Sequence, residues 1–275
     1  MRFPMAPEHP DRAAGPEAAG LAFDVPPATR RTSAVGFLLD AARTRPAGQR
    51  ALTSLVVLLF VSGAGLFTYP IFTDLYTEQV LQRSAAEEFQ RYEFEVGSYD
   101  EWADSVRGRT GAALTKIAIP RIGVETLVVE GTSPAALRAG AGHYPNTPLP
   151  GQEGNVAIAG HRTTYGKPFN RLDELRVGDS IWLATPVGDH RYEVVAEPAS
   201  DACEIAKAGF GACITGPKDW RVISPTAQAT LTLTTCHPKG SAAKRLVIRA
   251  VLVESQPAGT YDGLRDGGTL EALGA

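Results

Sequence analysis

The sequence has few cysteines, and none of its cysteines or histidines are paired at a metal-binding spacing. The three cysteines are scattered (Cys203, Cys213 and Cys236), and neither a Cys-x-x-Cys nor a His-x-x-x-His pair occurs. The spacing typical of a structural zinc site is therefore missing. The formal net charge is −3, so the chain lacks the positive excess of nucleic-acid-binding proteins. We expect no metal, no cofactor and no nucleic-acid partner.

Alternation of strands with long helices is also missing, which argues against a doubly wound α/β fold. Short strands are predicted instead at 115–122, 124–129, 155–160, 180–185 and 191–196, with a turn at Gly188 and Asp189. Ser133 followed by Pro134 marks the start of a short helix, and a helical turn is expected at 170–176. Many short strands joined by glycine-rich turns indicate a closed all-β domain. The pattern alone does not choose between a barrel and a sandwich.

Charged side chains are absent between Arg50 and Asp74. As a helix, residues 51–73 would be about 35 Å long, enough to cross a hydrocarbon core of about 30 Å. Arginines precede this stretch and acidic residues follow it, so the positive-inside rule places the N-terminus in the cytoplasm. We therefore predict a single-pass protein of the cell membrane whose large domain is extracellular.

A cleaved signal peptide is the alternative interpretation, with the small residues at 62–65 as the cleavage site. A leader of about fifty residues is long for a signal peptide, and the apolar stretch continues through Ile71. Residues 1–32 are rich in Pro, Ala and Glu, a composition typical of disorder. We expect a disordered cytoplasmic segment over residues 1–50.

Residues 74–95 contain neither Pro nor Gly, and their apolar positions follow one helical face (Leu75, Leu81, Ala85, Phe89 and Tyr92). This pattern predicts a juxtamembrane helix. Glycines among charged residues follow it, so we expect a linker up to residue 111.

The segment 229–250 carries the clearest chemical signal. Residues 229–235 alternate apolar and hydroxyl side chains, Cys236 ends this predicted strand, and a strongly β-branched run resumes at Arg245 after a turn-rich loop. If the two strands pair antiparallel, the thiol and the guanidinium face one small volume. A guanidinium there favours thiolate and can hold an oxyanion. By itself, however, a cysteine before a turn is more often a small core residue than a nucleophile.

Two motifs in this order resemble those of the sortases, the membrane-bound cysteine transpeptidases of Gram-positive bacteria. The first is TLTTC followed nine residues later by Arg245. The second is GHYPNTPLPGQEGNVAIAGHRTTYGKPFNRLDEL at 142–175, whose GHR, TTYG and PF residues are similar to those of the class E sortases of actinobacteria. The resemblance implies an eight-stranded β-barrel as the catalytic domain at 112–255, followed by a flexible tail at 256–275.

The resemblance also implies roles for individual residues. By this resemblance, Cys236 is the expected nucleophile and His161 the expected general acid and base. Arg245 is expected to hold the oxyanion or the substrate backbone. Imidazole suits proton transfer because it titrates near neutral pH.

Three further residues are expected to contact substrate. Tyr144 lies in a segment associated with accepting alanine after leucine in the signal. Thr235 and His237 flank the nucleophile, and His237 can equally be structural.

The implied reaction is cleavage of an LAxTG or LPxTG C-terminal sorting signal through a thioacyl enzyme, which then joins the surface protein to an amine of a peptidoglycan precursor. Three alternatives stay open. They are a pilin-polymerising sortase, a cysteine peptidase that uses water, and a non-enzymatic membrane-tethered β-barrel that binds wall components.

Cys203 and Cys213 lie close in sequence and, in an extracellular domain, face an oxidising compartment. We expect them to form a disulfide, with two reduced cysteines as the alternative, while Cys236 stays free. Asp201 and Glu204 are conceivable analogues of the calcium ligands of another sortase class, but nothing obliges them to bind a metal.

Overall fold

The computed structural model describes residues 46–261, so most of the expected N-terminal segment 1–50 and of the tail 256–275 lies outside the described residues. Two compact units divide the chain between Leu59 and Phe60. Of the first unit, the described part is the start of a helix. The second unit holds the rest of that helix and the whole predicted catalytic domain.

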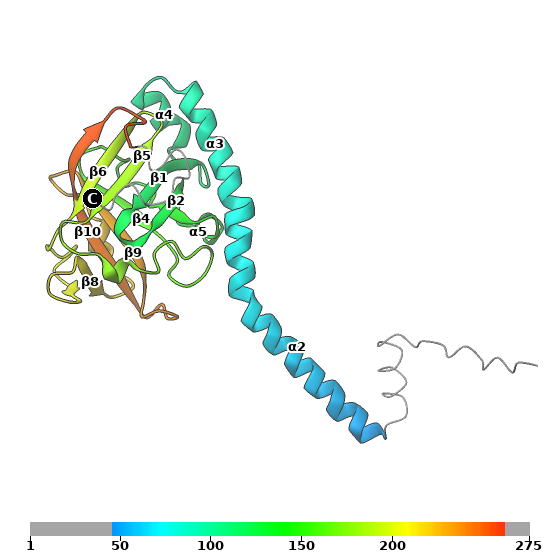
Figure 1. Ribbon diagram of the computed structural model, residues 1–275. Helices are drawn as coiled ribbons and strands as arrows, with labels where there is room; N and C mark the ends of the chain where they lie inside the picture. The colour runs from blue at the N-terminus through cyan, green and yellow to red at the C-terminus, as the bar shows by residue number, and fades with distance from the viewer. Residues whose placement is uncertain (1–45, 262–275) are drawn as a thin grey trace, which may run out of the picture. The chain divides into compact units, whose positions relative to one another are not determined.

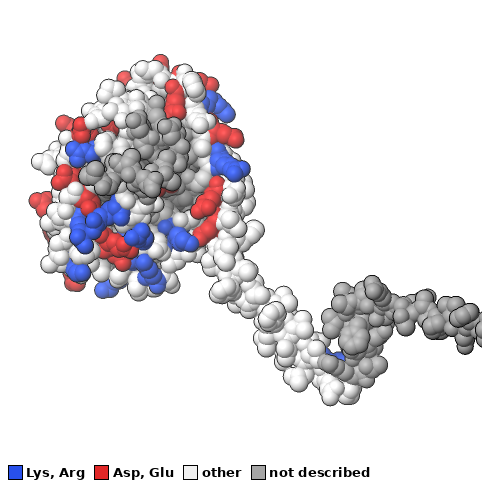
Figure 2. All heavy atoms as spheres, in the orientation of Figure 1, with Lys and Arg blue, Asp and Glu red and all other residues white. Residues whose placement is uncertain are grey.

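Helix α2 (Ala47–Tyr76) contains the charge-free segment and runs through a π-helical turn, η1 (Thr77–Leu81), into α3 (Gln82–Glu95). Large apolar side chains of α2 are exposed, for example 76% of Phe60 and 80% of Phe67. A helix of this length and exposure is suited to a membrane. Figure 2 shows helix α2 almost uniformly without charge, whereas acidic and basic side chains are interspersed over the visible face of the predicted catalytic domain.

Helix α3 buries one face, as the sequence pattern predicts. Ala85 and Phe89 pack with Leu127 and Val129 of the barrel, and Tyr92 packs in a neighbouring cluster around Trp102. The helix predicted at 74–95 is thus part of the domain's core.

The expected linker at 97–111 contains an ordered helix, α4 (Tyr99–Val106), capped by the Ser98 hydroxyl, which accepts a hydrogen bond from the Glu101 amide. Trp102 at its centre is fully buried. The glycines and charges around it suggested a linker, but three buried residues on one face were enough to dock the helix on the barrel.

Within the described residues, ten strands form one sheet (Figure 1). Their bounds are β1 (Ala113–Ile119), β2 (Val124–Glu130), β3 (Ala141–His143), β4 (Asn155–Ala159), β5 (Ser180–Thr185), β6 (Gly188–Val194), β7 (Glu204–Ile205), β8 (Ala212–Thr215), β9 (Thr230–His237) and β10 (Lys244–Gln256). The order β6-β5-β1-β2-β3-β4-β9-β10 closes because β10 also pairs with β6. The protein therefore has the predicted closed eight-stranded barrel, and the hairpin β7–β8 extends it along β10.

Alternating side chains fill the barrel. On β9 and β10, the residues Leu231, Leu233, Leu246, Ile248 and Ala250 point into the main core. Because side chains alternate across a strand, their neighbours lie on the opposite, outer face. The candidate site is built on that outer face.

Short helices connect the strands: η2 (Pro120–Ile122), α5 (Pro134–Arg138), η3 (Leu172–Glu174) and η4 (Trp220–Ile223). The helix predicted at Ser133 is α5, and the helical turn predicted near 172 is η3. The turn predicted at Gly188 and Asp189 is wrong, because both residues belong to β6 and the chain reverses just before them.

Candidate active site

Cys236 and Arg245 lie directly opposite each other on β9 and β10. The two strands pair antiparallel with Cys236 in register with Arg245 and Thr234 in register with Val247. Directly paired residues project to the same face of a sheet. The thiol-bearing and guanidinium-bearing residues are therefore neighbours on the outer face, as the sequence motif implies.

Cys236 is a free, half-buried cysteine near the end of β9. The half-buried Arg245 donates from Nη1 to the carbonyls of Ala242, at 3.0 Å, and Lys244, at 3.1 Å. These bonds hold the guanidinium against the loop that follows Cys236. Five N–H donors are available on a guanidinium, so others remain for a substrate oxygen.

His161 follows β4, which runs parallel to β9. Ala159 is in register with Thr234, and the Gly160 amide donates to the Thr234 carbonyl at 3.1 Å. His161 and Cys236 each lie two residues beyond this pair. Because the strands are parallel, both residues are at the same end of β4 and β9. The topology thus brings together Cys236, His161 and Arg245.

Thr235 braces this arrangement from the inside. It is 3% exposed, and its hydroxyl donates to the Gly160 carbonyl at 2.8 Å. Its hydroxyl was expected to face substrate, but alternation along β9 turns it inward, where it ties together the residues just before His161 and Cys236.

The imidazole of His161 is half-buried, and its ring centre lies 5.1 Å from that of Tyr165. Burial, and after it the positive charge of Arg138 on α5, lower the pKa of His161 below its ordinary value. The ring is therefore mostly neutral near pH 7, the form that can accept a proton from a thiol or an amine.

The loop after His161 has an unusual backbone. Tyr165, Gly166 and Lys167 all have positive φ, at 54°, 71° and 38°. Left-handed conformations cost free energy for residues with a Cβ. Asp74 on α2 holds the loop, because its carboxylate accepts the Gly166 amide at 2.9 Å and pairs with the Lys167 ammonium.

Tyr144 lies beside β9, the strand that carries Cys236. Its hydroxyl is 3.0 Å from the hydroxyl of Thr234, two residues before Cys236, and its amide donates to the Ala157 carbonyl on β4. The half-buried phenol therefore lies over β4 and β9 next to the candidate catalytic residues.

Sequence reasoning missed Arg162, the residue after His161. It is 3% exposed, and its Nη1 donates to the Cys236 carbonyl at 3.2 Å and to Nδ1 of His237 at 2.9 Å. His237 is thus held by an arginine of the loop at residues 160–171, called the histidine loop below. Only the buried position of an arginine in a turn could have signalled it, and burial is not readable from a single sequence.

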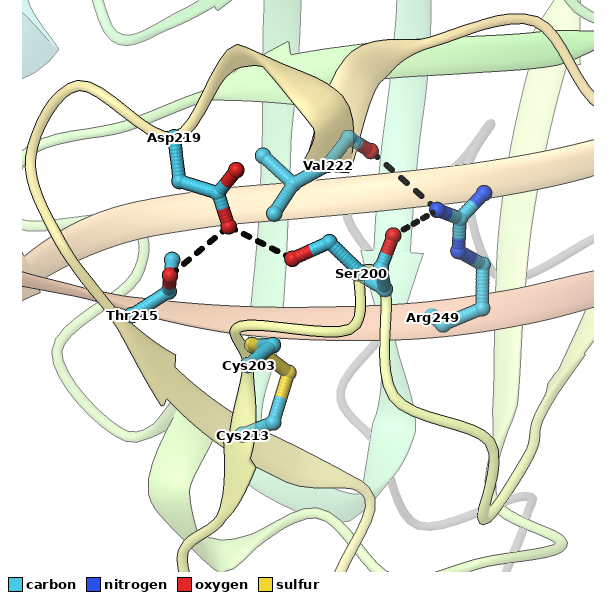
Figure 3. Close-up of a disulfide and its surroundings, with 8 residues drawn as sticks. Ser200, Cys203, Cys213, Thr215, Asp219, Val222 and Arg249 are labelled. Carbon is cyan, nitrogen blue, oxygen red and sulfur yellow. Dashed lines mark hydrogen bonds between the residues drawn. A yellow bond between two sulfur atoms is a disulfide. The ribbon is translucent and has the colours of Figure 1, made fainter.

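Cys203 and Cys213 form a disulfide on the same outer face (Figure 3). Cys213 is in register with Val247, and both sulfurs lie in an apolar cluster with Val222. The disulfide therefore connects Cys203, just before β7, to Cys213 in β8, the strand that pairs with β10.

A carboxylate fixes the surrounding loop. Asp219 accepts hydrogen bonds from the hydroxyls of Ser200 and Thr215 (Figure 3) and from Nε of Arg221. Burial raises the pKa of Asp219, but these hydrogen bonds outweigh it and lower the pKa to about 2. Thr215 is in turn the register partner of Arg245, so this cluster borders the site.

Metal ligands are not gathered at the site. Over residues 46–261, no group of three or more His, Cys, Asp and Glu side chains is placed to hold an ion. Asp201 and Glu204 are both exposed.

Comparison with known proteins identifies the family. The sortase domain model matches residues 117–253. Sortase D of Bacillus subtilis is 31% identical over 207 residues, covering 70% of this chain and 96% of the relative. Sortase SrtE1 of Streptomyces coelicolor is 27% identical over 58% of this chain, which spans 46% of that protein.

A solved structure of a sortase D5 transpeptidase from Clostridium perfringens superposes with a TM-score of 0.51 at 28% identity, covering 63% of this chain and 99% of that one. The chain belongs to the sortase family, the cysteine transpeptidases. The relatives include classes D and E, so the class E resemblance remains an expectation.

Proposed function

We propose that this protein cleaves a C-terminal sorting signal through a thioacyl enzyme on Cys236 and transfers the acyl group to an amine. The observation that supports it most is the register, which sets Arg245 opposite Cys236, while β4, which runs parallel to β9, ends two residues before His161. This register supports the assignment of nucleophile to Cys236, oxyanion donor to Arg245 and proton carrier to His161.

In the first half-reaction, His161 takes the thiol proton and the sulfur attacks the carbonyl carbon of the scissile peptide bond. Arg245 donates hydrogen bonds to the resulting oxyanion. When the intermediate collapses, the C–N bond breaks, His161 gives its proton to the departing amine, and a thioester remains on Cys236.

In the second half-reaction, an amine attacks the thioester and His161 takes its proton. Collapse of that intermediate forms the new amide and expels the thiolate, which the proton on His161 restores to the thiol. By family resemblance, the amine belongs to a peptidoglycan precursor and the acyl donor is a surface protein.

We infer an LAxTG signal from Tyr144. Alanine keeps the backbone N–H that proline lacks, so the phenolic oxygen can accept that hydrogen bond. A proline in this position has no N–H to donate, so the Tyr144 hydroxyl would lack this partner, and the proline ring would press against the tyrosine ring.

The membrane arrangement is also a proposal. Helix α2 carries the apolar segment, with Arg45 and Arg50 before it and Asp74 and Glu78 after it. This charge bias supports a cytoplasmic N-terminus and an extracellular catalytic domain.

The full-length protein in detergent tests the function when it is incubated with LAxTG and LPxTG peptides, with and without an amine acceptor. Chromatography should show an amide product that requires the acceptor. Release of free acid alone would identify a hydrolase, and no cleavage of either peptide would contradict the proposal.

A further inference from the structure

Arg162 is a buried cation that hydrogen-bonds to Cys236 and His237 of the candidate site. Burial of a charge is costly unless hydrogen bonds and an opposite charge compensate it. Nη2 of Arg162 pairs with Asp173 at 3.0 Å, but that carboxylate is 41% exposed, whereas the arginine side chain is 3% exposed. The remaining bonds go to main-chain carbonyls and to an imidazole. Such a group is held in one orientation.

The contacts of Nη1 link the two catalytic segments. Nη1 donates to the carbonyl of Cys236, while the main chain of Arg162 itself continues directly from His161. Asn170 strengthens this link, because its amide donates to the Arg162 carbonyl at 2.6 Å and its oxygen accepts from Lys239 at 3.2 Å. The histidine loop and the loop after the nucleophile are therefore tied through one guanidinium and one amide.

The contact with His237 defines the state of that ring. A guanidinium only donates, so Nδ1 of His237 must accept, and the neutral ring carries its proton on Nε2. The charged groups facing this ring are Arg162 and Asp173 from the histidine side and Lys244, its register partner on β10. Burial first, then the charge of Arg162, lower the pKa of His237.

We propose that Arg162 is a positioning residue for transpeptidation: it fixes the main chain of Cys236 relative to His161 and keeps His237 neutral as an Nε2–H donor beside the nucleophile. This inference rests on the proposed function. It assigns Arg162 a task separate from that of Arg245, which is bonded to the carbonyls of its own loop.

The chain offers a matched control. Arg171 lies in the same loop, but it is half-exposed and pairs with Glu174 at 2.7 Å. Arg162→Gln removes the positive charge, Arg162→Lys keeps the charge with one donor group in place of the fork, and Arg171→Gln removes an arginine that does not touch Cys236 or His237.

The experiment measures kcat and KM in the full-length protein together with an NMR pH titration of His237. We expect Arg162→Gln to lower kcat by about 10- to 100-fold, the loss for a charged hydrogen bond, with KM within about threefold. Arg162→Lys should recover part of kcat. The pKa of His237 should rise in Arg162→Gln and stay unchanged in Arg171→Gln.

An unchanged kcat or an unchanged His237 titration in Arg162→Gln would overturn the proposal. So would a loss of activity in Arg162→Lys that only follows its folded fraction in a thermal melt, because that is the signature of a purely structural arginine. If wild type cleaves no peptide, the proposed function fails. The titration of His237 then still tests whether Arg162 controls that ring.

Discussion

Tyr144 and Thr234 place two hydroxyls 3.0 Å apart near Cys236, so the phenol has a fixed position from which to contact the proposed sorting signal. Tyr144→Phe keeps the ring and removes the acceptor. We expect the preference for LAxTG over LPxTG, measured as a ratio of kcat/KM values, to narrow by about ten- to a hundredfold.

Tyr99→Phe on α4 is the matched control, since among the described residues its hydroxyl hydrogen-bonds only to the Pro150 carbonyl, at 3.5 Å. If Tyr144→Phe leaves the preference ratio unchanged, alanine is selected elsewhere and the tyrosine is a packing residue.

Arg138 influences His161 through charge. Because the arginine lowers the pKa of the imidazole, Arg138→Gln should raise it and move the acid limb of the kcat/KM profile to higher pH. Arg138 is exposed, so this difference should shrink as salt is added. NMR titration of His161 in both proteins checks the direction. A downward shift, or none at low salt, would show that Arg138 does not act on the ring.

At the scale of elements, helix α2 and the histidine loop are connected by Asp74. The loop has three consecutive residues at positive φ, and the Asp74 carboxylate accepts one of their amides. Asp74→Ala should release the loop, because it removes both the bond to the Gly166 amide and the pair with Lys167, and should lower kcat by about tenfold and speed amide exchange over 161–169.

Glu87→Gln on the exposed side of α3 is the control for Asp74→Ala. Unchanged exchange over the loop in the Asp74 variant, measured by mass spectrometry, would mean that the loop keeps its backbone without the helix.

The disulfide stabilises a second element, the β7–β8 hairpin. A closed loop with a sequence separation of 10 restricts the unfolded chain by about 3 kcal/mol in the entropic model. Cys203→Ala with Cys213→Ala should lower the melting temperature by several degrees. Thiol counting of denatured wild type should find one free thiol, and three free thiols together with an unshifted melting curve would contradict the bridge.

In the whole molecule, the sequence predicted those features that depend on neighbouring residues, such as single helices and strand pairs joined by a short loop. The charge-free stretch after Arg50 is in a helix, as predicted. The short loop between Cys236 and Arg245 favours antiparallel pairing of their strands, so the sequence could predict that these two residues lie opposite each other. The turn chemistry at Ser133 likewise predicted α5.

Features that depend on contacts between distant residues could not be predicted from the sequence pattern. The strand β3 is three residues long, and β7 and β8 form a short hairpin inside a loop. Arg162 reaches Cys236 across 74 positions, a contact that no sequence period encodes. The closure between β10 and β6 is equally non-local and was expected only from the family resemblance.

In the proposed mechanism, Cys236 carries the acyl group. Full-length protein mixed with excess LAxTG peptide and quenched in acid should gain the mass of the acyl fragment, which peptide mapping should locate on Cys236. Cys236→Ala should show neither adduct nor cleavage, while His161→Ala and Arg245→Ala should form the adduct slower by several orders of magnitude with the fold intact. Cleavage by Cys236→Ala, or an adduct mapped to another residue, would contradict the account.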